Sequence, residues 1–202
     1  MKRLPVLAAV LISVCASHAQ EKVSREDCLK YAFMVSANLK ELLATPIPTD
    51  PDVKRPAGVK DGGCGAMALP ETKLTAQTFA GLGEKVVPVG QLWLARLVPA
   101  AGGQAVKSEK LRLVHLAHGD SELDVPCLAL GAHKAADGNL ELMLYGKTAE
   151  SLLRLSLKPV SATAQDTPIE LSAERRDDSS GLLKLTFVGK YQATLEVRLA
   201  GQ

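Results

Sequence analysis

The residues with the greatest capacity for chemistry are histidines and a cysteine that lie within nineteen residues of one another, in the stretch "HLAHGDSELDVPCLALGAH". Imidazole nitrogens and thiolate sulfurs are the ligands that zinc and copper accept in proteins. This stretch therefore offers one alternative for the function, a metal-dependent or hydrolytic enzyme. The residues concerned are His115, His118, Cys127 and His133.

The spacing of these residues argues against a shared metal ion. His115 and His118 are three positions apart, so on one strand they point to opposite faces. If 111–118 and 122–130 form a hairpin, Cys127 lies opposite residue 112 or 114. At about 3.3 Å per residue, that position is roughly 13–20 Å from His118. We therefore favour exposed histidines and a buried thiol over a metal centre.

The stretch "HGDSE" also contains the residue types of a hydrolase, in His118, Asp120 and Ser121. A nucleophilic serine needs a base beside it and a third group that orients the base. Three residues of one tight turn cannot stack in that order, and Asp and Ser after Gly are typical of turns. We expect a turn here.

Other polar clusters have simpler interpretations. "ERRDDSSG" could hold a cation through Asp177 and Asp178, but it lacks the spaced oxygen ligands of a calcium loop. Among the aromatic residues, only Trp93 and Tyr145 are free of a predicted core position, so a glycan platform has no support. The sequence therefore identifies no catalytic residue, no cofactor site and no metal site.

The N-terminus has the pattern of a secretory signal peptide. Lys2 and Arg3 precede an apolar segment, 4–16, that is too short to span a bilayer. Ser17 and Ala19 are small residues in cleavage-site positions, which predicts residues 1–19 as the signal peptide. Cys15 could instead be a lipoprotein cysteine, but Val14 before it is not the small residue that lipidation requires. We expect an exported protein, periplasmic or secreted.

Three cysteines would remain after cleavage, in a compartment that favours disulfides. Cys28 lies on a helix that must dock, and Cys64 lies in a glycine-rich loop that is free to approach it, although Cys64 could also be a reactive thiol. Cys127 lies in "VPCLAL", where a small buried thiol packs well. We predict a Cys28–Cys64 disulfide and a free, buried Cys127, with Cys64–Cys127 as the rival pairing.

Composition and charge limit the possible partners. The chain of 202 residues has a net charge of +2, and both surplus charges leave with the signal peptide. Nucleic-acid binding depends on phosphate neutralisation by Lys and Arg, so a neutral mature chain disfavours nucleic-acid partners. No long apolar run follows the signal peptide, so no membrane span is expected after cleavage.

The chain divides into an N-terminal helix at 20–45, a linker or surface loop at 46–71 and a β-domain at 72–202. In the helix, Ser24 is the expected N-cap, and an apolar stripe recurs at spacings of three and four. Prolines and glycines crowd the linker, so we expect neither helix nor strand there. The stripe consists of Cys28, Ala32, Phe33, Ser36, Leu39 and Leu43, widened by Leu29 and Leu42.

The β-domain shows short apolar runs separated by turn residues. In 191–199 the apolar residues alternate with polar ones, which places Leu195 in the core and Glu196 on the surface and is typical of an antiparallel sheet with one wet face. Asp137-Gly138 predicts a hairpin turn. The expected fold is mainly β, a two-sheet antiparallel sandwich or barrel of about eight strands with one N-terminal helix. The strands are expected at 85–98 (one or two), 111–118, 122–130, 139–145, 151–157, 168–174, 182–188 and 191–199.

These features favour an exported, non-enzymatic binding or structural protein of the cell envelope or extracellular space. A carrier of an apolar ligand is a further alternative, because the chain is rich in leucine. The partner itself is not identified by any motif.

Overall fold

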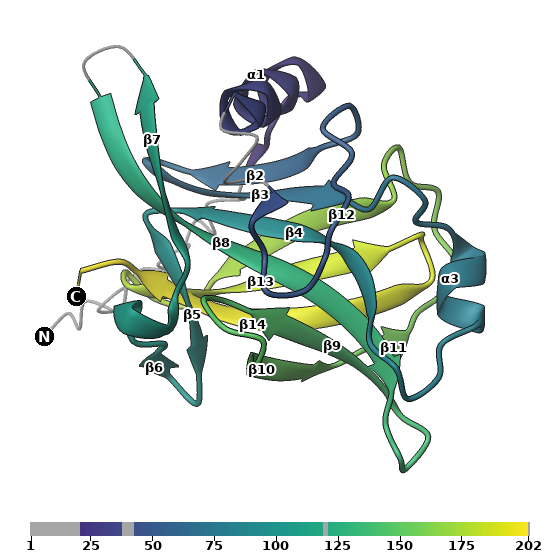
Figure 1. Cartoon of the computed structure of the whole chain (residues 1–202). Coiled ribbons are helices and arrows are strands. Elements are labelled where there is room, and N and C mark those ends of the chain that lie inside the picture. The colour runs from purple at the N-terminus through teal and green to yellow at the C-terminus, as the bar shows by residue number, and fades with distance from the viewer. Residues whose placement is uncertain (1–20, 38–42, 119–120, 202) are drawn as a thin grey trace, which may run out of the picture.

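The computed structural model describes residues 21–37, 43–118 and 121–201. It is mainly β, with 51% strand and 12% helix, and its strands form two antiparallel sheets (Figure 1). The predicted fold class is therefore confirmed. The predicted signal peptide, residues 1–19, lies outside the described residues. Among the described helices, none is both long and apolar enough to cross a membrane.

The first sheet has the order β1-β2-β3-β4-β8-β9-β10, and β7 pairs with β8 beside it. Its strands are β1 (Glu21–Lys22), β2 (Ala57–Asp61), β3 (Cys64–Pro70), β4 (Val87–Ala95), β7 (Leu113–His118), β8 (Ser121–Lys134), β9 (Leu140–Tyr145) and β10 (Ser151–Ser156).

The second sheet has the order β12-β13-β14-β5-β6, and β11 pairs with β14. Its strands are β5 (Leu97–Ala101), β6 (Gln104–Ala105), β11 (Lys158–Pro159), β12 (Ile169–Arg175), β13 (Ser180–Phe187) and β14 (Tyr191–Leu199). The chain passes from the first sheet to the second at Arg96, which has a φ of 56°.

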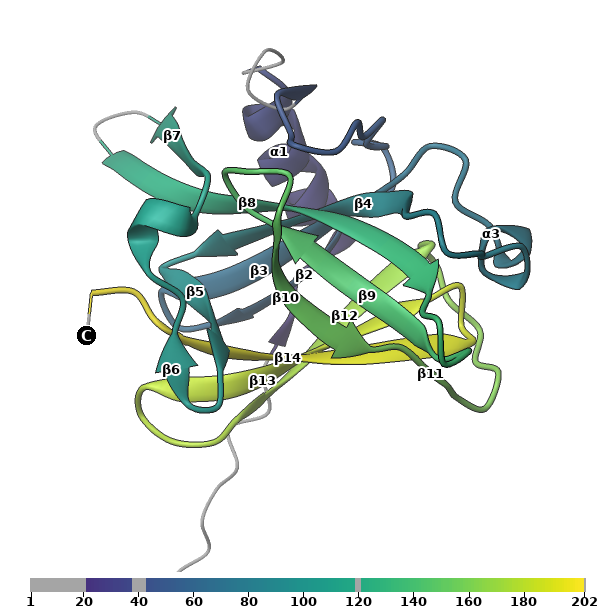
Figure 2. The same cartoon turned by 60° about the horizontal axis from the view of Figure 1, so that its bottom comes forward.

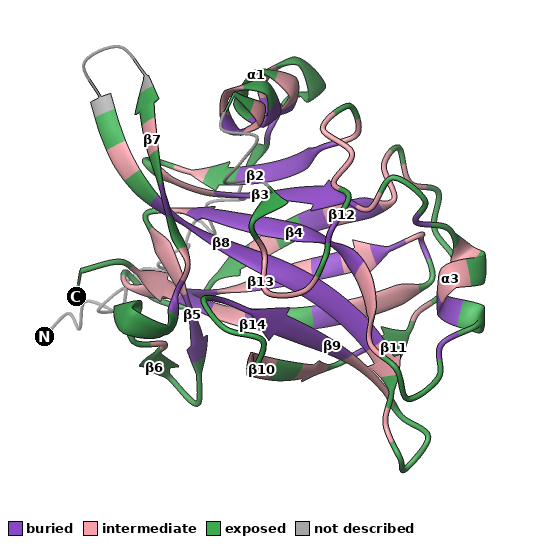
Figure 3. Ribbon diagram, viewed as in Figure 1, coloured by how far each residue is buried: buried purple, intermediate pink, exposed green. Residues whose placement is uncertain are grey.

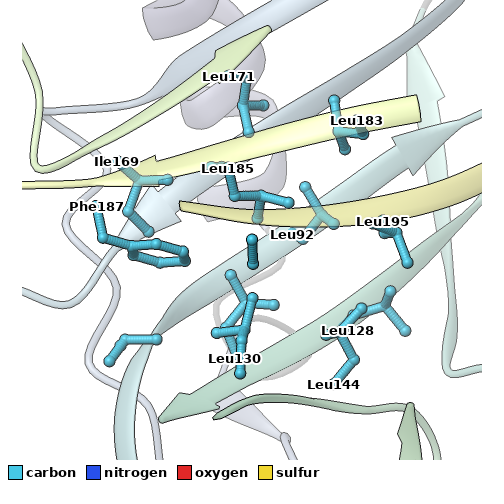
Figure 4. Close-up of a cluster of buried hydrophobic side chains, with 14 of the residues drawn as sticks. Leu92, Leu128, Leu130, Leu144, Ile169, Leu171, Leu183, Leu185, Phe187 and Leu195 are labelled. Atoms are coloured by element: carbon cyan, nitrogen blue, oxygen red, sulfur yellow. The ribbon is translucent and has the colours of Figure 1, made fainter. Parts of the chain in front are cut away.

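Leucine-rich faces of the two sheets form the main core between them (Figure 4). Alternation places every second side chain of these strands inward, so the residues that fill this layer come at spacings of two. The side chains with no exposed surface include Leu92, Leu128, Leu130, Leu144, Ile169, Leu185, Phe187 and Leu195. The prediction that Leu195 faces the core is confirmed, and Glu196 lies on the outer face of its sheet, where it is partly exposed.

A third layer covers the outer face of the first sheet. It consists of α1 (Arg25–Ser36) and residues 45–56, which we call the strap. Figure 2 shows α1, the first sheet and the second sheet in that order, and Figure 3 shows β4 and β8 of the first sheet coloured as buried along most of their length. Ala32 and Val35 of α1 pack on this outer face, and Ile47 of the strap packs against Tyr145.

Hydrogen bonds fasten the strap to the end of β3. The backbone N–H of Asp50 donates to both carboxylate oxygens of Glu71, at 3.0 and 2.9 Å. Arg55 Nη2 donates to the carbonyl oxygen of Thr72 at 2.9 Å. The proline-rich segment is therefore an integral part of the outer layer.

The short helix α3 (Ala76–Ala80) and the 3-10 turn η1 (Ser108–Lys110) complete the described elements. Phe79 of α3 is buried, and its ring stacks on Tyr191 with centroids 4.9 Å apart. This contact ties α3 to β14.

The prediction that residues 46–71 contain neither helix nor strand is wrong. β2 and β3 lie in this segment and pair with each other from Ala57↔Ala68 to Asp61↔Cys64. The glycines do not break the strands, because Gly62, with a φ of 58°, supplies the left-handed conformation of the hairpin turn between them. The prolines fall before β2 or at the last residue of β3, where they cost no ladder hydrogen bond.

The predicted N-terminal helix is partly correct. Ser24 is the N-cap, since its hydroxyl accepts the N–H of Asp27 at 3.1 Å. Helix α1 ends at Ser36, before the predicted end at residue 45, and residues 38–42 lie outside the described chain. Phe33 is 60% exposed, so it does not belong to the buried stripe, which consists of Cys28, Ala32 and Val35.

The strands predicted from 85 onwards are confirmed, with small shifts of their ends. The predicted first strand region, 85–98, is divided between β4 and β5, which lie in different sheets. The Asp137-Gly138 turn joins β8 to β9, and Asp137 accepts the N–H of Asn139 at 2.9 Å.

Candidate functional site

The structure separates the histidines that could have shared a metal ion. His115 is exposed on β7, with its Nδ1 3.0 Å from the Asp124 carboxylate. His133 lies near the other end of β8, with its Nε2 3.0 Å from Glu141. Asp124 and His133 are nine residues apart along one strand, which corresponds to about 30 Å. The side chain of His118 is outside the described part of the chain.

Cys127 is fully buried between these two positions. Its N–H donates to the carbonyl oxygen of Arg112 at 2.9 Å, so of the two predicted positions opposite Cys127, residues 112 and 114, the structure has the first. Its Sγ lies 3.9 Å from Oε1 of Gln91. Within the described ranges, no three His, Cys, Asp or Glu side chains lie close enough to hold a metal ion. The described geometry therefore gives no support to an enzyme built on this region.

The predicted Cys28–Cys64 disulfide is absent, because neither Cys28 nor Cys64 forms a disulfide in the described part of the chain. The reason lies in the β2–β3 hairpin. The pair Gly58↔Met67 faces α1, and the would-be Cβ of Gly58 is only 3.0 Å from Cys28 Sγ.

Cys64 belongs to the opposite face of that hairpin. It pairs with Asp61, three positions from the pair that contacts Cys28, and Asp61 faces Arg175 of the second sheet. Three residues of strand span about 10 Å, whereas a disulfide needs Cα atoms about 4.4–6.8 Å apart. Because side chains alternate along a strand, this odd spacing also places Cys64 on the face opposite to Cys28.

The carboxylate of Asp177, in the β12–β13 turn, accepts hydrogen bonds from the residues that follow it in the chain. Its carboxylate accepts the hydroxyl of Ser180 and both the N–H and the hydroxyl of Ser179, the latter two at 2.7 and 2.9 Å. These bonds, with that of Ser180 the largest, lower the pKa of Asp177 from 3.8 to about 2. Because the oxygens are already used, the turn has the form of a self-satisfied Asx turn.

A groove of about 340 Å³ lies between α1, the β2–β3 hairpin and the β7–β8 hairpin. We call it the α1 groove. One wall comes from α1, the floor comes from β3 and β4, and the other wall comes from β7 and β8. The principal lining residues are Tyr31, Met34, Val35, Met67, Trp93, Leu116, Leu123 and Val125.

The groove exists because the β7–β8 hairpin extends past the neighbouring strand. Residues 113–118 pair with 121–126, whereas β8 begins to pair with β4 only at Cys127. Alternation places Leu116 and Leu123 on the face towards α1 and His115 on the other face. The β7–β8 hairpin therefore lies opposite α1, as Figure 1 shows. The space between the hairpin and α1 is lined by apolar side chains.

Hydrogen bonds hold the indole of Trp93 in the groove floor. Its Nε1–H donates to Oε1 of Gln91 at 3.1 Å, and Nε2 of Gln91 donates to Oγ1 of Thr49 in the strap at 2.9 Å. Gln91 has no exposed surface, and Trp93 is 2% exposed. Because the indole N–H already has an acceptor, Trp93 lines the groove without an unsatisfied polar atom.

Cys28 and Lys60, two polar groups of the groove, lie at its β2 side. Burial raises the pKa of the Cys28 thiol, and the nearby Asp27 carboxylate adds to that effect, so the thiol stays protonated at neutral pH. Lys60, on the edge of the groove, is the one charged residue among the described residues that line it. The groove is therefore suited to an apolar group with at most one ionic end.

A second cavity, of about 270 Å³, lies on the other side of the β2–β3 hairpin, at one end of the sandwich. Arg175 Nη2 and Nε donate to Oδ2 of Asp61 across it, at 2.8 and 3.0 Å. Asp61 and Arg175 of this cavity therefore already pair with each other.

The sequence interpretation missed the α1 groove. The alternation in 113–117 and 122–126 was visible and could have placed Leu116 and Leu123 on one face. Nothing local indicated that α1 would lie opposite that face, because their contact joins segments about 80 residues apart. Comparison with known proteins adds nothing here, since no protein-family model, curated protein or solved structure matches the chain.

Proposed function

We propose that the protein is an exported, non-enzymatic binding protein that holds an apolar ligand in the α1 groove. The observation behind this proposal is the combination of volume and lining. At about 340 Å³, the groove falls within the range of roughly 300–1,000 Å³ that is common for small-molecule sites. Its walls and floor are aliphatic, aromatic and thioether side chains.

The energetics favour a flexible hydrocarbon ligand. Each buried methylene contributes about 0.8 kcal/mol, so a chain of eight methylenes gains roughly 6 kcal/mol before the costs of binding are subtracted. Met34 and Met67 add side chains that adapt to irregular apolar shapes. Export, inferred from residues 1–19, would place such a binding protein outside the cytoplasm.

The single tryptophan of the chain provides a direct test. Trp93 lines the groove, so a bromine atom on a bound ligand should quench its fluorescence. We expect 11-bromo-1-undecanol to quench wild-type protein saturably. Absence of saturable quenching would contradict the proposal.

Two neighbouring residues of α1 supply a matched pair of variants. Met34 lines the groove, and Phe33 does not line it and is 60% exposed. Met34→Arg should place a charge in the groove and abolish saturable quenching. Phe33→Arg should leave quenching as in wild type and controls for a change of charge on the helix. Equal behaviour of the two variants would locate the binding elsewhere.

A further inference from the structure

The charge at the end of the α1 groove defines the ligand more closely. We infer that the ligand is a medium-chain fatty acid, whose carboxylate lies at Lys60 and whose hydrocarbon chain extends along the groove towards Trp93. This inference rests on the proposed function, and it adds the polar end of the ligand and its charge.

The strand register places Lys60 on the groove side of β2. Lys60 pairs with Gly65, and it is two residues from Gly58, whose would-be Cβ meets Cys28 of α1. Residues two apart on a strand share a face. The ammonium group is therefore on the α1 side of the hairpin, at the edge of the apolar lining.

The present partner of Lys60 leaves the ammonium available to a ligand. Its Nζ is 3.4 Å from Oε2 of Glu21, and the two side chains are 44% and 72% exposed. Such exposed pairs contribute about 0–1 kcal/mol, so exchange of Glu21 for a ligand carboxylate costs little. An ammonium also has three donors, which allows it to keep one protein contact while it binds the ligand.

The surrounding carboxylates favour a single negative charge on the ligand. Glu21 and Asp27 both lie close to Lys60. The hydrogen bond from Ser24 contributes most to the lowered pKa of Asp27, and the charge of Lys60 adds a smaller contribution. A dianionic group such as a phosphate monoester would meet these two carboxylates with only one lysine in the lining to offset them. A monocarboxylate needs only the one cation.

The opposite end of the groove matches a hydrocarbon tail. Trp93, Leu116, Leu123 and Val125 line it without a charged side chain among them. A fatty acid therefore has its polar and apolar ends in the same order as the groove. A neutral alcohol of equal length makes the same apolar contacts but lacks the ionic one.

Two brominated probes of equal chain length test this inference by quenching of Trp93 fluorescence. We expect 11-bromoundecanoate to bind wild-type protein about 2- to 5-fold more tightly than 11-bromo-1-undecanol, the size of one partly exposed charge contact. Lys60→Met should remove this difference and leave the affinity for the alcohol unchanged.

Lys22→Met is the matched control, because Lys22 is also a strand lysine near the N-terminus but does not line the groove, and it pairs with Glu170 at 3.4 Å. It should preserve the preference for the carboxylate. Equal affinity of wild type for both probes, or a preference that survives in Lys60→Met, would overturn the inference while the proposed function stands. Saturable quenching by neither probe would overturn both.

Discussion

At the scale of single residues, Gln91 shows how the outer layer accommodates a polar group. Its amide is fully buried, accepts the indole N–H of Trp93 and donates to Thr49. A buried polar group without hydrogen bonds destabilises the fold by about 1–3 kcal/mol. The two hydrogen bonds of the Gln91 amide avoid this cost. The sequence could not predict this arrangement, because Thr49 and Gln91 are 42 positions apart.

Asp177 provides a pH prediction at the same scale. Its folded pKa of about 2 is lower than the ordinary 3.8, so the bonds to its carboxylate stabilise the fold above pH 3.8 and are lost as the pH falls towards 2. Ser180→Ala removes the largest of these contacts and should raise the pKa of Asp177. Carbon-13 NMR titration of the aspartate carboxyl groups measures the midpoint.

Ser172→Ala is a suitable control for this titration, because Ser172 is exposed on β12 and pairs with Lys184 in the sheet, away from Asp177. The control should leave the midpoint near 2. A wild-type midpoint close to 3.8 would show that the serine contacts are not formed in solution.

At the scale of elements, β14 places neighbouring residues in opposite environments, one in the core and one on the outer face of its sheet. Leu195 is fully buried, and Glu196, on the other face, accepts the N–H of Gly103 at 3.0 Å. Leu195→Ala should reduce the free energy of unfolding by about 2–5 kcal/mol. Glu196→Gln retains an acceptor and should change it by less than about 0.5 kcal/mol. Urea denaturation measures both, and similar losses would mean that β14 faces the other way.

The link between the two sheets is a second test of an element. Arg96 is exposed and has a φ of 56°, a left-handed conformation that costs about 1–2 kcal/mol for most residues. Asparagine adopts it more readily, so Arg96→Asn should stabilise the protein by up to about 1 kcal/mol. Arg96→Val should destabilise it, because a β-branched residue is disfavoured there. Equal urea midpoints for the two variants would contradict this conformation.

The strands differ in how well they could be predicted from the sequence. The alternation in β12 and β14 is local, and it predicted β14 with its observed ends and β12 with ends that differ by one residue. β2 and β3 were missed because Gly62 and Gly63 were interpreted as breakers, whereas they form a hairpin turn. The same misreading produced the disulfide prediction, since a mobile loop could bring Cys64 to Cys28 and a rigid hairpin cannot.

At the scale of the whole molecule, three layers determine what is accessible. The α1 groove depends on the meeting of α1, the β2–β3 hairpin and the β7–β8 hairpin, and none of these contacts is local in sequence. Sequence patterns alone therefore predicted the two sheets but not the third layer or the site that it encloses. The three cysteines lie at different depths in these layers, so the rates at which their thiols react test the layered arrangement.

Alkylation of the native protein by iodoacetamide at pH 8 should follow that order of depth. Cys64 is partly exposed at the hairpin and should react first. Cys28 lies on the buried face of α1, is 2% exposed and has a pKa raised chiefly by burial, so its reaction requires local detachment of the helix and formation of a scarce thiolate. Cys127 has no exposed surface and lies between the outer layer and the sheet, so it should react only when the molecule unfolds globally.

Peptide mass mapping over time assigns each label, and low urea separates the mechanisms. The rate at Cys127 should rise with urea as steeply as the global unfolding equilibrium, because labelling then tracks the fully open state. The rate at Cys28 should rise less steeply, since detachment of one helix exposes less surface. Labelling of Cys127 as fast as Cys64 would contradict the layered arrangement, and a Cys28–Cys64 linked peptide would contradict the separation of these two thiols by the β2–β3 hairpin.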